Sequence, residues 1–356
     1  MRAIYSDKHR LHNPALEYWE GELLPFYECP RRAEIILAAV QAAGIGPVTP
    51  PGDFGLGPIL AVHDAEYTRF LQRAYDAWVA SGRNPNGVHP DTFAARGMTH
   101  RPTDLALQAG YYSHDVTTII TQGTWEAAYA AAQCAVTAAR HVAGGERSAF
   151  AVCRPPGHHA HADLSAGYCF LNNAAIAAQW LIDSARPPVS GAPNAVALLD
   201  IDFHHGNGSQ QIFYARRDVL YVSLHADPNR HYPYFLGTSD ERGEGDGLGF
   251  NLNFPLEGGV TDDAYLEALN QACARIKEYA PAWLVVSLGV DTFGGDPITD
   301  FALTGKAYSR IGACIAQLNR PTVFIMEGGY AVDQLGDNVA GVLTGFVAET
   351  ESVVSG

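Results

Sequence analysis

The chain has 356 residues, of which 47% are hydrophobic and 17% are charged, and its formal net charge is −15. This apolar content indicates a large buried core and argues against a disordered protein. Proteins that bind nucleic acid through its phosphates need clustered Lys and Arg, so the acidic balance argues against that class. The lysines, Lys8, Lys277 and Lys306, are too few and too scattered for a polybasic membrane patch.

The N-terminal segment has neither the apolar stretch nor the small-residue cleavage site of a signal peptide. No stretch reaches the roughly 18 apolar residues that suggest a membrane-spanning helix. The cysteines are scattered, without a Cys-x-x-Cys pair, at Cys29, Cys134, Cys153, Cys169, Cys273 and Cys314. Because this pattern is typical of reduced thiols, we expect a cytoplasmic protein.

Short apolar runs alternate with longer segments of helical periodicity. The apolar runs predict strands at 2–5, 148–153, 195–201, 219–224, 283–288 and 322–326. The periodic segments predict helices at 31–43, 64–81, 124–142, 209–214, 262–279, 306–318 and 332–348. Two stretches, 82–101 and 226–249, are rich in turn-forming and polar residues and are predicted to be long loops. The alternation favours an α/β fold with a single mostly parallel β-sheet and helices on both faces, in one domain spanning 1–356.

Polar residues that suit catalysis or metal binding stand at or just beyond the ends of five of the predicted strands. They are His158 and His159, then Asp200, Asp202 and His204, then Ser223, then Asp291, and finally Glu327 and Tyr330. In open α/β sheets, ligands bind at the carboxyl ends of the strands. Five strands that end in this way therefore predict one shared site.

A metal site is predicted around the sequence Asp202-Phe203-His204. Side chains alternate along a strand, so Asp202 and His204 point to the same side. With Asp291 they give three protein ligands, and three ligands plus an open position is the catalytic arrangement of zinc. The same donors also suit Fe²⁺. Asp200 directly follows the apolar run, so we expect it to be buried, where it orients a histidine or binds a monovalent cation.

An acid–base pair is predicted at His158 and His159, which follow a Pro-Pro-Gly turn. Paired imidazoles near a metal can act as general base and general acid if their partners separate their pKa values, and Asp200 and Asn207 are candidate partners. Tyr330 follows two glycines, and its hydroxyl could donate a hydrogen bond to a developing oxyanion.

The motifs around these residues resemble the zinc-dependent histone deacetylase family. They are RPPGHH at 154–159, GYCFLNN at 167–173, LDIDFHHGNG at 199–208, VSLH at 222–225, SLGVDTF at 287–293 and MEGGY at 326–330. The resemblance spans almost the whole chain and is closest to the bacterial acetylpolyamine amidohydrolases and histone deacetylase-like amidohydrolases. It implies the arginase–deacetylase fold and a deacetylase-like catalytic domain.

The resemblance also implies a reaction, in which a metal-activated water hydrolyses N-acyl amides, chiefly acetyl amides. It assigns one Zn²⁺ to Asp202, His204 and Asp291. It makes His158 and His159 the tandem acid–base pair, supported by Asp200 and Asn207, and makes Tyr330 the stabiliser of the oxyanion.

Further residues are assigned by the same resemblance to a structural K⁺ and to the substrate. The K⁺ ligands would be Asp200, Ser223 and Leu224, together with the backbone carbonyls of Asp202 and His204. An outer cation would bind backbone carbonyls near Phe213, Arg216 and Val219. The substrate would contact Trp19, Gly167, Tyr168 and Tyr232. The family also suggests a homodimer, in which the loop 82–101 reaches the rim of the partner's site.

The substrate is predicted to be a small acetylated amine or a neutral small amide. Acetylpolyamine hydrolases carry acidic residues at the positions of Ala106 and Thr117. Because this chain lacks those two carboxylates, we expect its attraction for a cationic polyamine to be weaker. Two alternatives are a protein acetyl-lysine deacetylase and a module that only binds acetylated ligands. A third, a di-manganese ureohydrolase, lacks second-metal ligands, because Gly206 and Phe293 stand at those positions.

Overall fold

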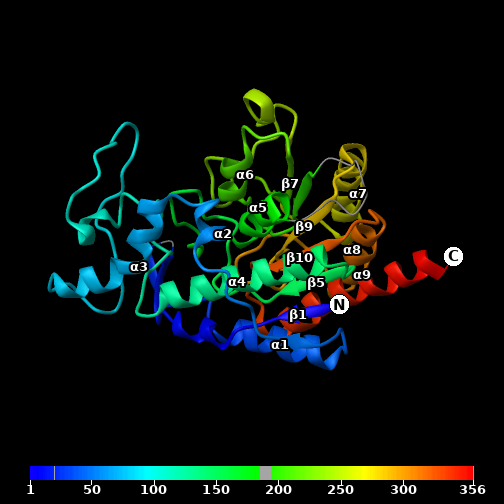
Figure 1. Ribbon diagram of the computed structural model, residues 1–356, viewed down its shortest axis with the longest axis horizontal. Coiled ribbons are helices and arrows are strands. Elements are labelled where there is room, and N and C mark those ends of the chain that lie inside the picture. Colours follow the sequence, from blue (N-terminus) through cyan, green and yellow to red (C-terminus); the bar gives the residue numbers. More distant parts are fainter. Residues whose placement is uncertain (20, 185–193, 356) are drawn as a thin grey trace.

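The computed structural model describes residues 1–19, 21–184 and 194–355 (Figure 1). In this part of the chain, eight strands form one sheet in which every pairing is parallel. Across the sheet the strands are β4 (Val48–Thr49), β1 (Arg2–Ile4), β5 (Ser148–Ala151), β10 (Thr322–Met326), β9 (Trp283–Leu288), β6 (Val196–Asp200), β7 (Val219–Ala226) and β8 (Asn251–Leu256). The predicted mostly parallel sheet is confirmed.

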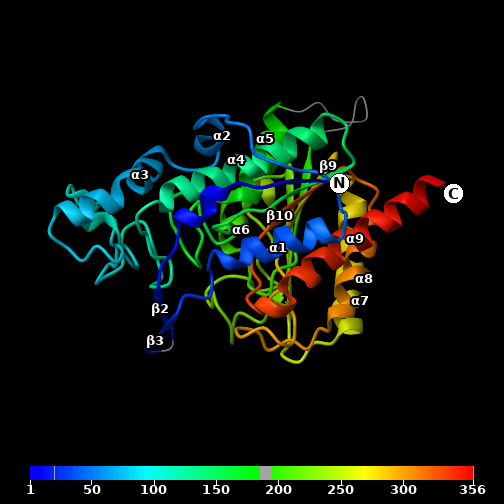
Figure 2. The same cartoon turned by 90° about the horizontal axis from the view of Figure 1, so that it is seen from below.

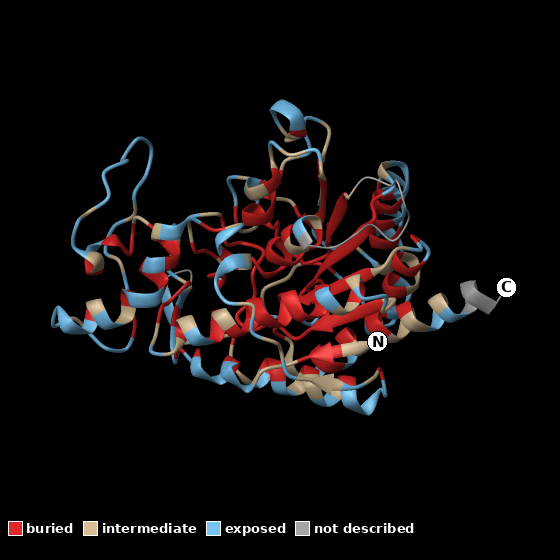
Figure 3. Ribbon diagram, in the orientation of Figure 1, coloured by how far each residue is buried: buried red, intermediate tan, exposed pale blue. Residues whose placement is uncertain are grey.

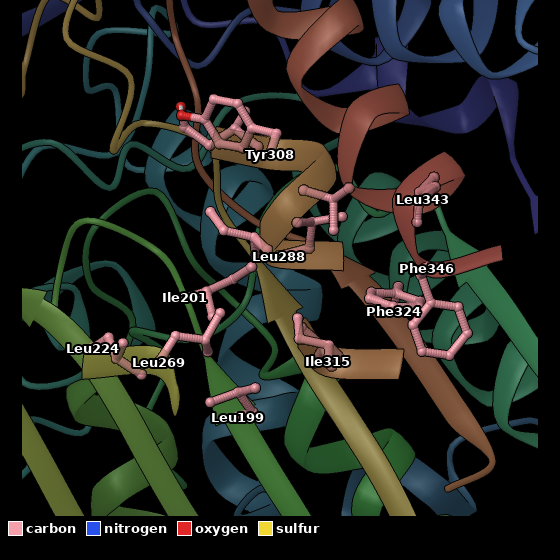
Figure 4. Close-up of a cluster of buried hydrophobic side chains, with 14 of the residues drawn as sticks. Leu199, Ile201, Leu224, Leu269, Leu288, Tyr308, Ile315, Phe324, Leu343 and Phe346 are labelled. Carbon is pink, nitrogen blue, oxygen red and sulfur yellow. Dashed lines mark hydrogen bonds between the residues drawn. The ribbon is translucent and has the colours of Figure 1, made fainter. Parts of the chain in front are cut away.

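Helices cover both faces of the sheet, as predicted (Figure 2). One face is covered by α4 (Thr124–Ala143) and α5 (Asn173–Ser184), and the other by α1 (Arg31–Ala42), α7 (Asp262–Tyr279), α8 (Gly305–Ala316) and α9 (Val332–Ser355). Strand alternation explains the two layers, because Leu198 of β6 packs in the cluster with α4 and α5. The next residue, Leu199, packs on the opposite face with α7, α8 and α9 (Figure 4). The sheet and the inner faces of these helices are accordingly buried (Figure 3).

Beyond the sheet, α2 (Gly57–Leu60), α3 (Ala65–Ala80) and the 3-10 turn η2 (Leu105–Gln108) build an outlying layer with a loop at 82–101. Asp64 is the N-cap of α3, because its carboxylate accepts the backbone N–H groups of Glu66 and Tyr67 at 2.8 and 3.0 Å. The antiparallel hairpin of β2 (Leu16–Trp19) and β3 (Glu22–Pro25) follows the 3-10 turn η1 (Asp7–Leu11). The remaining elements are α6 (Asn207–Phe213) and the turn η3 (Gly245–Gly247).

Several elements were not predicted from the sequence, among them α5 and β8. The segment of α5 is apolar almost all round, so it has no amphipathic period that would reveal a helix. The segment of β8 contains two asparagines and Pro255, which disfavour strands. Proline is tolerated there because β8 lies at the edge of the sheet, where one side of the strand has no neighbour.

Candidate active site and metal centre

Four neighbouring strands bring the predicted site residues together at their carboxyl ends. The strands β5, β10, β9 and β6 are adjacent in the sheet. His158 and His159 follow β5, Tyr330 follows β10, Asp291 follows β9, and Asp202 with His204 follows β6. All six residues are at most 8% exposed.

The ligand atoms of Asp202, His204 and Asp291 lie within 4.8 Å of one another. The Nδ1 atom of His204 is 3.4 Å from Asp202 and 3.2 Å from Asp291. Among the described residues, no other group of three or more His, Cys, Asp and Glu side chains converges in this way. Two carboxylates and one imidazole, gathered and buried, fit a divalent cation with an open coordination position.

The electrostatics of this group favour a positive charge. Burial raises the pKa of Asp291, repulsion from Asp202 raises it further, and the result is about 7. Although burial lowers the pKa of His204, the carboxylates of Asp202 and Asp291 raise it to about 9. Both shifts arise from the negative charge of the two buried carboxylates, which a bound cation would offset.

Glycines make room for the carboxylates. A Cβ atom at Gly289 would stand 2.1 Å from Asp202, and one at Gly328 would stand 2.4 Å from Asp291. The backbone N–H of Gly328 also donates to Asp202 at 2.8 Å, which orients that carboxylate.

The tandem histidines have different partners, as the sequence suggested. Nδ1 of His158 lies 3.0 Å from Asp200, and Nδ1 of His159 lies 2.7 Å from Asn207. The Nδ2 of Asn207 is 3.1 Å from His161, which keeps the amide oxygen turned toward His159. The two imidazole rings are in contact, with centroids 4.0 Å apart.

These partners separate the pKa values of the two histidines. Burial lowers the pKa of His158, but the carboxylates of Asp202 and Asp200 outweigh it and raise the pKa to about 10. Burial and the neighbouring positive charge of His158 hold the pKa of His159 well below its usual value of 6.5. At neutral pH, His158 is therefore cationic and His159 neutral, which is a division into acid and base forms.

The residues assigned to a monovalent cation lie on two paired strands. Asp200 of β6 is in register with Ser223 of β7, and Leu224 follows. The carboxylate of Asp200 already accepts hydrogen bonds from the backbone N–H of Asp202 and the hydroxyl of Tyr221, both at 3.2 Å. The hydroxyl of Ser223 is 2.8 Å from His225.

Tyr330 is positioned by two residues to which the sequence assigned no role, although Asp296 belongs to a further motif of the family resemblance, Asp296-Pro297. Asp296 accepts the backbone N–H of Tyr330 at 2.6 Å. Arg32 donates to the carbonyls of Gly329 and Glu327 at 2.6 and 2.7 Å, and its guanidinium lies 4.7 Å from the centre of the Tyr330 ring. Burial raises the pKa of Tyr330 well above its usual value, so the phenol keeps its proton at neutral pH.

Arg32 is itself held by Glu28, at 2.7 Å, in a buried ion pair. Glu327, at the end of β10, accepts the backbone N–H of His158 at 3.2 Å and so supports the first histidine as well. The contact between Glu327 and His158 has no local signature, because its partners lie 169 positions apart, whereas Glu28 and Arg32 are only four residues apart.

A narrow cavity of about 40 Å³ opens onto these groups. Its lining includes each residue predicted to contact substrate, and it consists of Trp19, Thr117, His159, Gly167, Tyr168, His204, Tyr232, Ile298 and Tyr330. The lining is mostly aromatic and apolar, which suits a short acyl chain.

The hydroxyls of the two wall tyrosines are bound by carboxylates. Tyr168 donates to Glu17 at 2.6 Å, and Tyr232 donates to Asp115 at 2.8 Å. The same oxygen of Asp115 accepts the backbone N–H of Gly167 at 2.6 Å. These carboxylates therefore support the walls of the cavity.

The two positions that lack acidic residues have different surroundings. Thr117 lines the cavity. Ala106 is only 3% exposed and packs in the apolar cluster beneath α3. A change at position 117 would therefore alter the cavity lining, whereas a change at position 106 would disturb packing instead.

In the described residues, no helix is long and apolar enough to cross a membrane.

Comparisons with known proteins identify the family of the chain. The histone deacetylase domain family matches residues 26–346. Acetylpolyamine amidohydrolase 1 of Pseudomonas aeruginosa is 51% identical, over 97% of this chain and 99% of its own length. Acetylpolyamine amidohydrolase of Mycoplana ramosa is 46% identical, over 97% and 99%.

A solved structure shows the same fold, which confirms the predicted arginase–deacetylase architecture. It is the crystal structure of an acetylpolyamine aminohydrolase from Burkholderia pseudomallei, with a TM-score of 0.92 and 40% identity, covering 98% of this chain and 99% of that one. The chain belongs to the histone deacetylase domain family and, like these relatives, is a hydrolytic enzyme.

Proposed function

We propose that the protein is a zinc-dependent amidohydrolase that removes the acetyl group from small acetylated amines or neutral small amides. The observation that carries the proposal is the convergence of three kinds of group on one cavity. His204 of the three-ligand cluster, the neutral His159 and the protonated Tyr330 all line it.

Asp202, His204 and Asp291 would hold the metal. When bound, Zn²⁺ would supply Lewis acidity, polarising the amide carbonyl and lowering the pKa of a water molecule, and Fe²⁺ suits the same donors. The phenol of Tyr330 would donate a hydrogen bond to the carbonyl oxygen as negative charge develops on it, which stabilises the transition state.

His159 is the residue suited to proton transfer. Its imidazole is neutral, so it can accept a proton from the attacking water and return it to the nitrogen of the leaving amine. His158 stays cationic beside Asp200 and contributes positive charge to the site. The water oxygen joins the carbonyl carbon, the C–N bond breaks, and acetate and the amine are released.

The nature of the cavity supports a small substrate of low charge. None of the described residues that line it carries a carboxylate. The nearby Glu17 and Asp115 are engaged with the wall tyrosines. We therefore expect a cationic polyamine to bind more weakly here than a neutral amide of similar shape, although relatives are named for acetylpolyamines.

Three further features complete the proposal. A K⁺ bound by Asp200, Ser223 and Leu224, with backbone carbonyls of Asp202 and His204, would stabilise the strand ends that carry the zinc ligands. The protein would act in the cytoplasm. It would form a homodimer in which the loop 82–101 lies at the rim of the partner's site.

The deciding experiment compares kcat/KM for acetylputrescine, an acetyl-lysine peptide and neutral acetyl amides, using protein whose metal content has been measured. We expect turnover of the small substrates, lost in Tyr330→Phe. A preference of orders of magnitude for acetylputrescine would contradict the low-charge substrate, and a preference for the peptide would identify a protein deacetylase. No turnover by fully zinc-loaded protein, with ligand binding unchanged in Tyr330→Phe, would identify a binding module instead.

A further inference from the structure

Two cysteines face each other between α7 and α8, outside the site described above. These helices lie side by side against one face of the sheet (Figures 1 and 2). The sulfur of Cys273 on α7 is 3.8 Å from the sulfur of Cys314 on α8. A disulfide has an S–S distance of about 2.05 Å, so a movement of less than about 2 Å would bring the two sulfurs to bonding distance.

Other contacts hold the two helices in this register. Arg310 of α8 forms an ion pair with Asp263 of α7 at 2.9 Å. One turn before Cys273, Asn270 accepts the thiol of Cys314 at 3.2 Å. Both contacts lie on the N-terminal side of Cys273 in α7, and they fix the register that makes the two sulfurs neighbours.

The surroundings of the two thiols are unequal in a way that favours stepwise oxidation. Cys273 is 5% exposed, and Cys314 is partly exposed. A hydrogen bond from the Cys273 thiol lowers the pKa of Cys314, burial opposes this, and the ammonium of Lys277 lowers it further. The same hydrogen bond and burial raise the pKa of Cys273. A more accessible and more acidic thiol beside a buried thiol, with the two sulfurs 3.8 Å apart, is the arrangement of redox-active pairs.

The remaining cysteines do not share this arrangement. Cys134, Cys153 and Cys169 are buried, and burial raises the pKa of each. Cys29 is partly exposed, and the structure pairs it with no other sulfur among the described residues. One pair out of six cysteines is thus placed for a disulfide.

We propose that Cys273 and Cys314 form a reversible disulfide when the protein is exposed to a peroxide. The Cys314 thiolate attacks a peroxide oxygen, becomes a sulfenic acid and releases hydroxide when the oxidant is hydrogen peroxide. The Cys273 sulfur then attacks the Cys314 sulfur, the S–O bond breaks, and the hydroxyl group leaves as water with the thiol proton. Two thiols are oxidised and one peroxide is reduced to two waters, and a dithiol reductant restores both thiols.

The bond would link two positions 41 residues apart. The segment between them contains β9 and the candidate metal ligand Asp291. It also contains Asp296, which accepts the backbone N–H of Tyr330. A cross-link stabilises by restricting the unfolded chain, and it does so here around the part of the chain that completes the site.

The test treats the reduced full-length protein with hydrogen peroxide and maps cysteine states by mass spectrometry. We expect a single cross-linked peptide pair joining Cys273 to Cys314, a mass loss of about 2 Da, and reversal by dithiothreitol. The cross-linked protein should melt a few °C higher than the reduced protein. An unchanged or lower Tm, or cysteines that stay reduced or pair otherwise, would overturn the proposal.

Three variants separate the roles of the two cysteines. In Cys273→Ser, Cys314 should accumulate a sulfenic acid that dimedone traps, because no second thiol resolves it. In Cys314→Ser, Cys273 should stay reduced, because the oxidant does not reach it. The matched control Cys29→Ser should cross-link as the wild type does. Equal oxidation of Cys273 in Cys314→Ser would show that exposure of Cys314 does not direct the reaction.

Discussion

The phenol of Tyr232 donates a 2.8 Å hydrogen bond to the carboxylate of Asp115, which also accepts the backbone N–H of Gly167. Gly167 precedes Tyr168, the other aromatic residue in the wall of the cavity. One carboxylate therefore connects both aromatic walls, through a side chain on one side and the backbone on the other. We infer that Asp115 fixes the spacing between the walls and does not bind the substrate itself.

Tyr232→Phe removes this hydrogen bond and keeps the aromatic ring. A hydrogen bond to a charged group contributes about 1.5–3 kcal/mol, so part of that loss should appear as weaker substrate binding. We expect KM for an acetylated substrate to rise roughly tenfold, with kcat within about twofold. Steady-state kinetics would measure both constants. Tyr234→Phe, at a tyrosine that is 52% exposed, is the matched control and should leave KM unchanged.

Asp291→Asn should release the metal and abolish activity while the fold remains. The change removes one of three candidate ligands together with its negative charge. Loss of an outer-shell partner costs about 10- to 100-fold in metal affinity, so we expect a loss of at least 100-fold for a ligand. Metal analysis, activity and circular dichroism on one preparation would test this. Asp300→Asn, in the same segment but paired with His231 at 3.0 Å, should keep its metal. Full metal content in Asp291→Asn would refute the ligand assignment.

Asn207→Asp should move the pH dependence of catalysis. The amide oxygen of Asn207 is 2.7 Å from His159, so the variant places a negative charge beside that ring. A carboxylate at this distance raises a histidine pKa by about 1–3 units. His159 must be neutral to accept a proton, so the acid limb of kcat/KM should move to higher pH. Asn207→Ala, which adds no charge, should lose activity without this movement. An unmoved acid limb in Asn207→Asp would argue against His159 as the base.

The stability of the protein should fall below about pH 6.5 because of its buried neutral histidines. Burial lowers the pKa of His63 from 6.5 to about 4, and its Nε2 accepts the backbone N–H of Asn172 at 2.9 Å. The unfolded chain binds this proton more tightly, so the stabilisation is full above pH 6.5 and is lost as the pH falls toward 4. At pH 5 the loss is about 2 kcal/mol for this residue.

Urea unfolding of wild type and His63→Gln at pH 7.5 and pH 5 would measure the contribution of His63 to the free energy of unfolding. The variant should lose about 2 kcal/mol less between the two pH values than the wild type does. His100→Gln, at an exposed histidine, should behave as the wild type. Equal losses in wild type and His63→Gln would show that His63 titrates alike in the folded and unfolded protein.

The sequence was sufficient to predict residues whose positions depend on local pattern. Asp202, His204 and Asp291 each follow an apolar run, and their ligand atoms converge as expected. The predicted strand alternation of Asp202 and His204 was wrong, because β6 ends at Asp200 and both residues lie in the bend that follows it. The supports of the site were not predictable, because they join distant segments. Arg32 meets Gly329 across 297 positions, and Tyr232 meets Asp115 across 117. No local period marks such a contact, which exists only after the sheet has brought the strand ends together.

The substrate preference should change with charge at position 117. Thr117 lines the cavity, so Thr117→Glu would place a carboxylate where a cationic amine passes. An exposed ion pair contributes about 0.2–1 kcal/mol, so kcat/KM for acetylputrescine should rise up to about fivefold and fall again with salt. A neutral acetyl amide should show no gain. Ala106→Glu would instead bury a carboxylate at a position that is 3% exposed, and should lower Tm. If both substrates improved equally in Thr117→Glu, a change in cavity shape would explain the result and the electrostatic argument would fail.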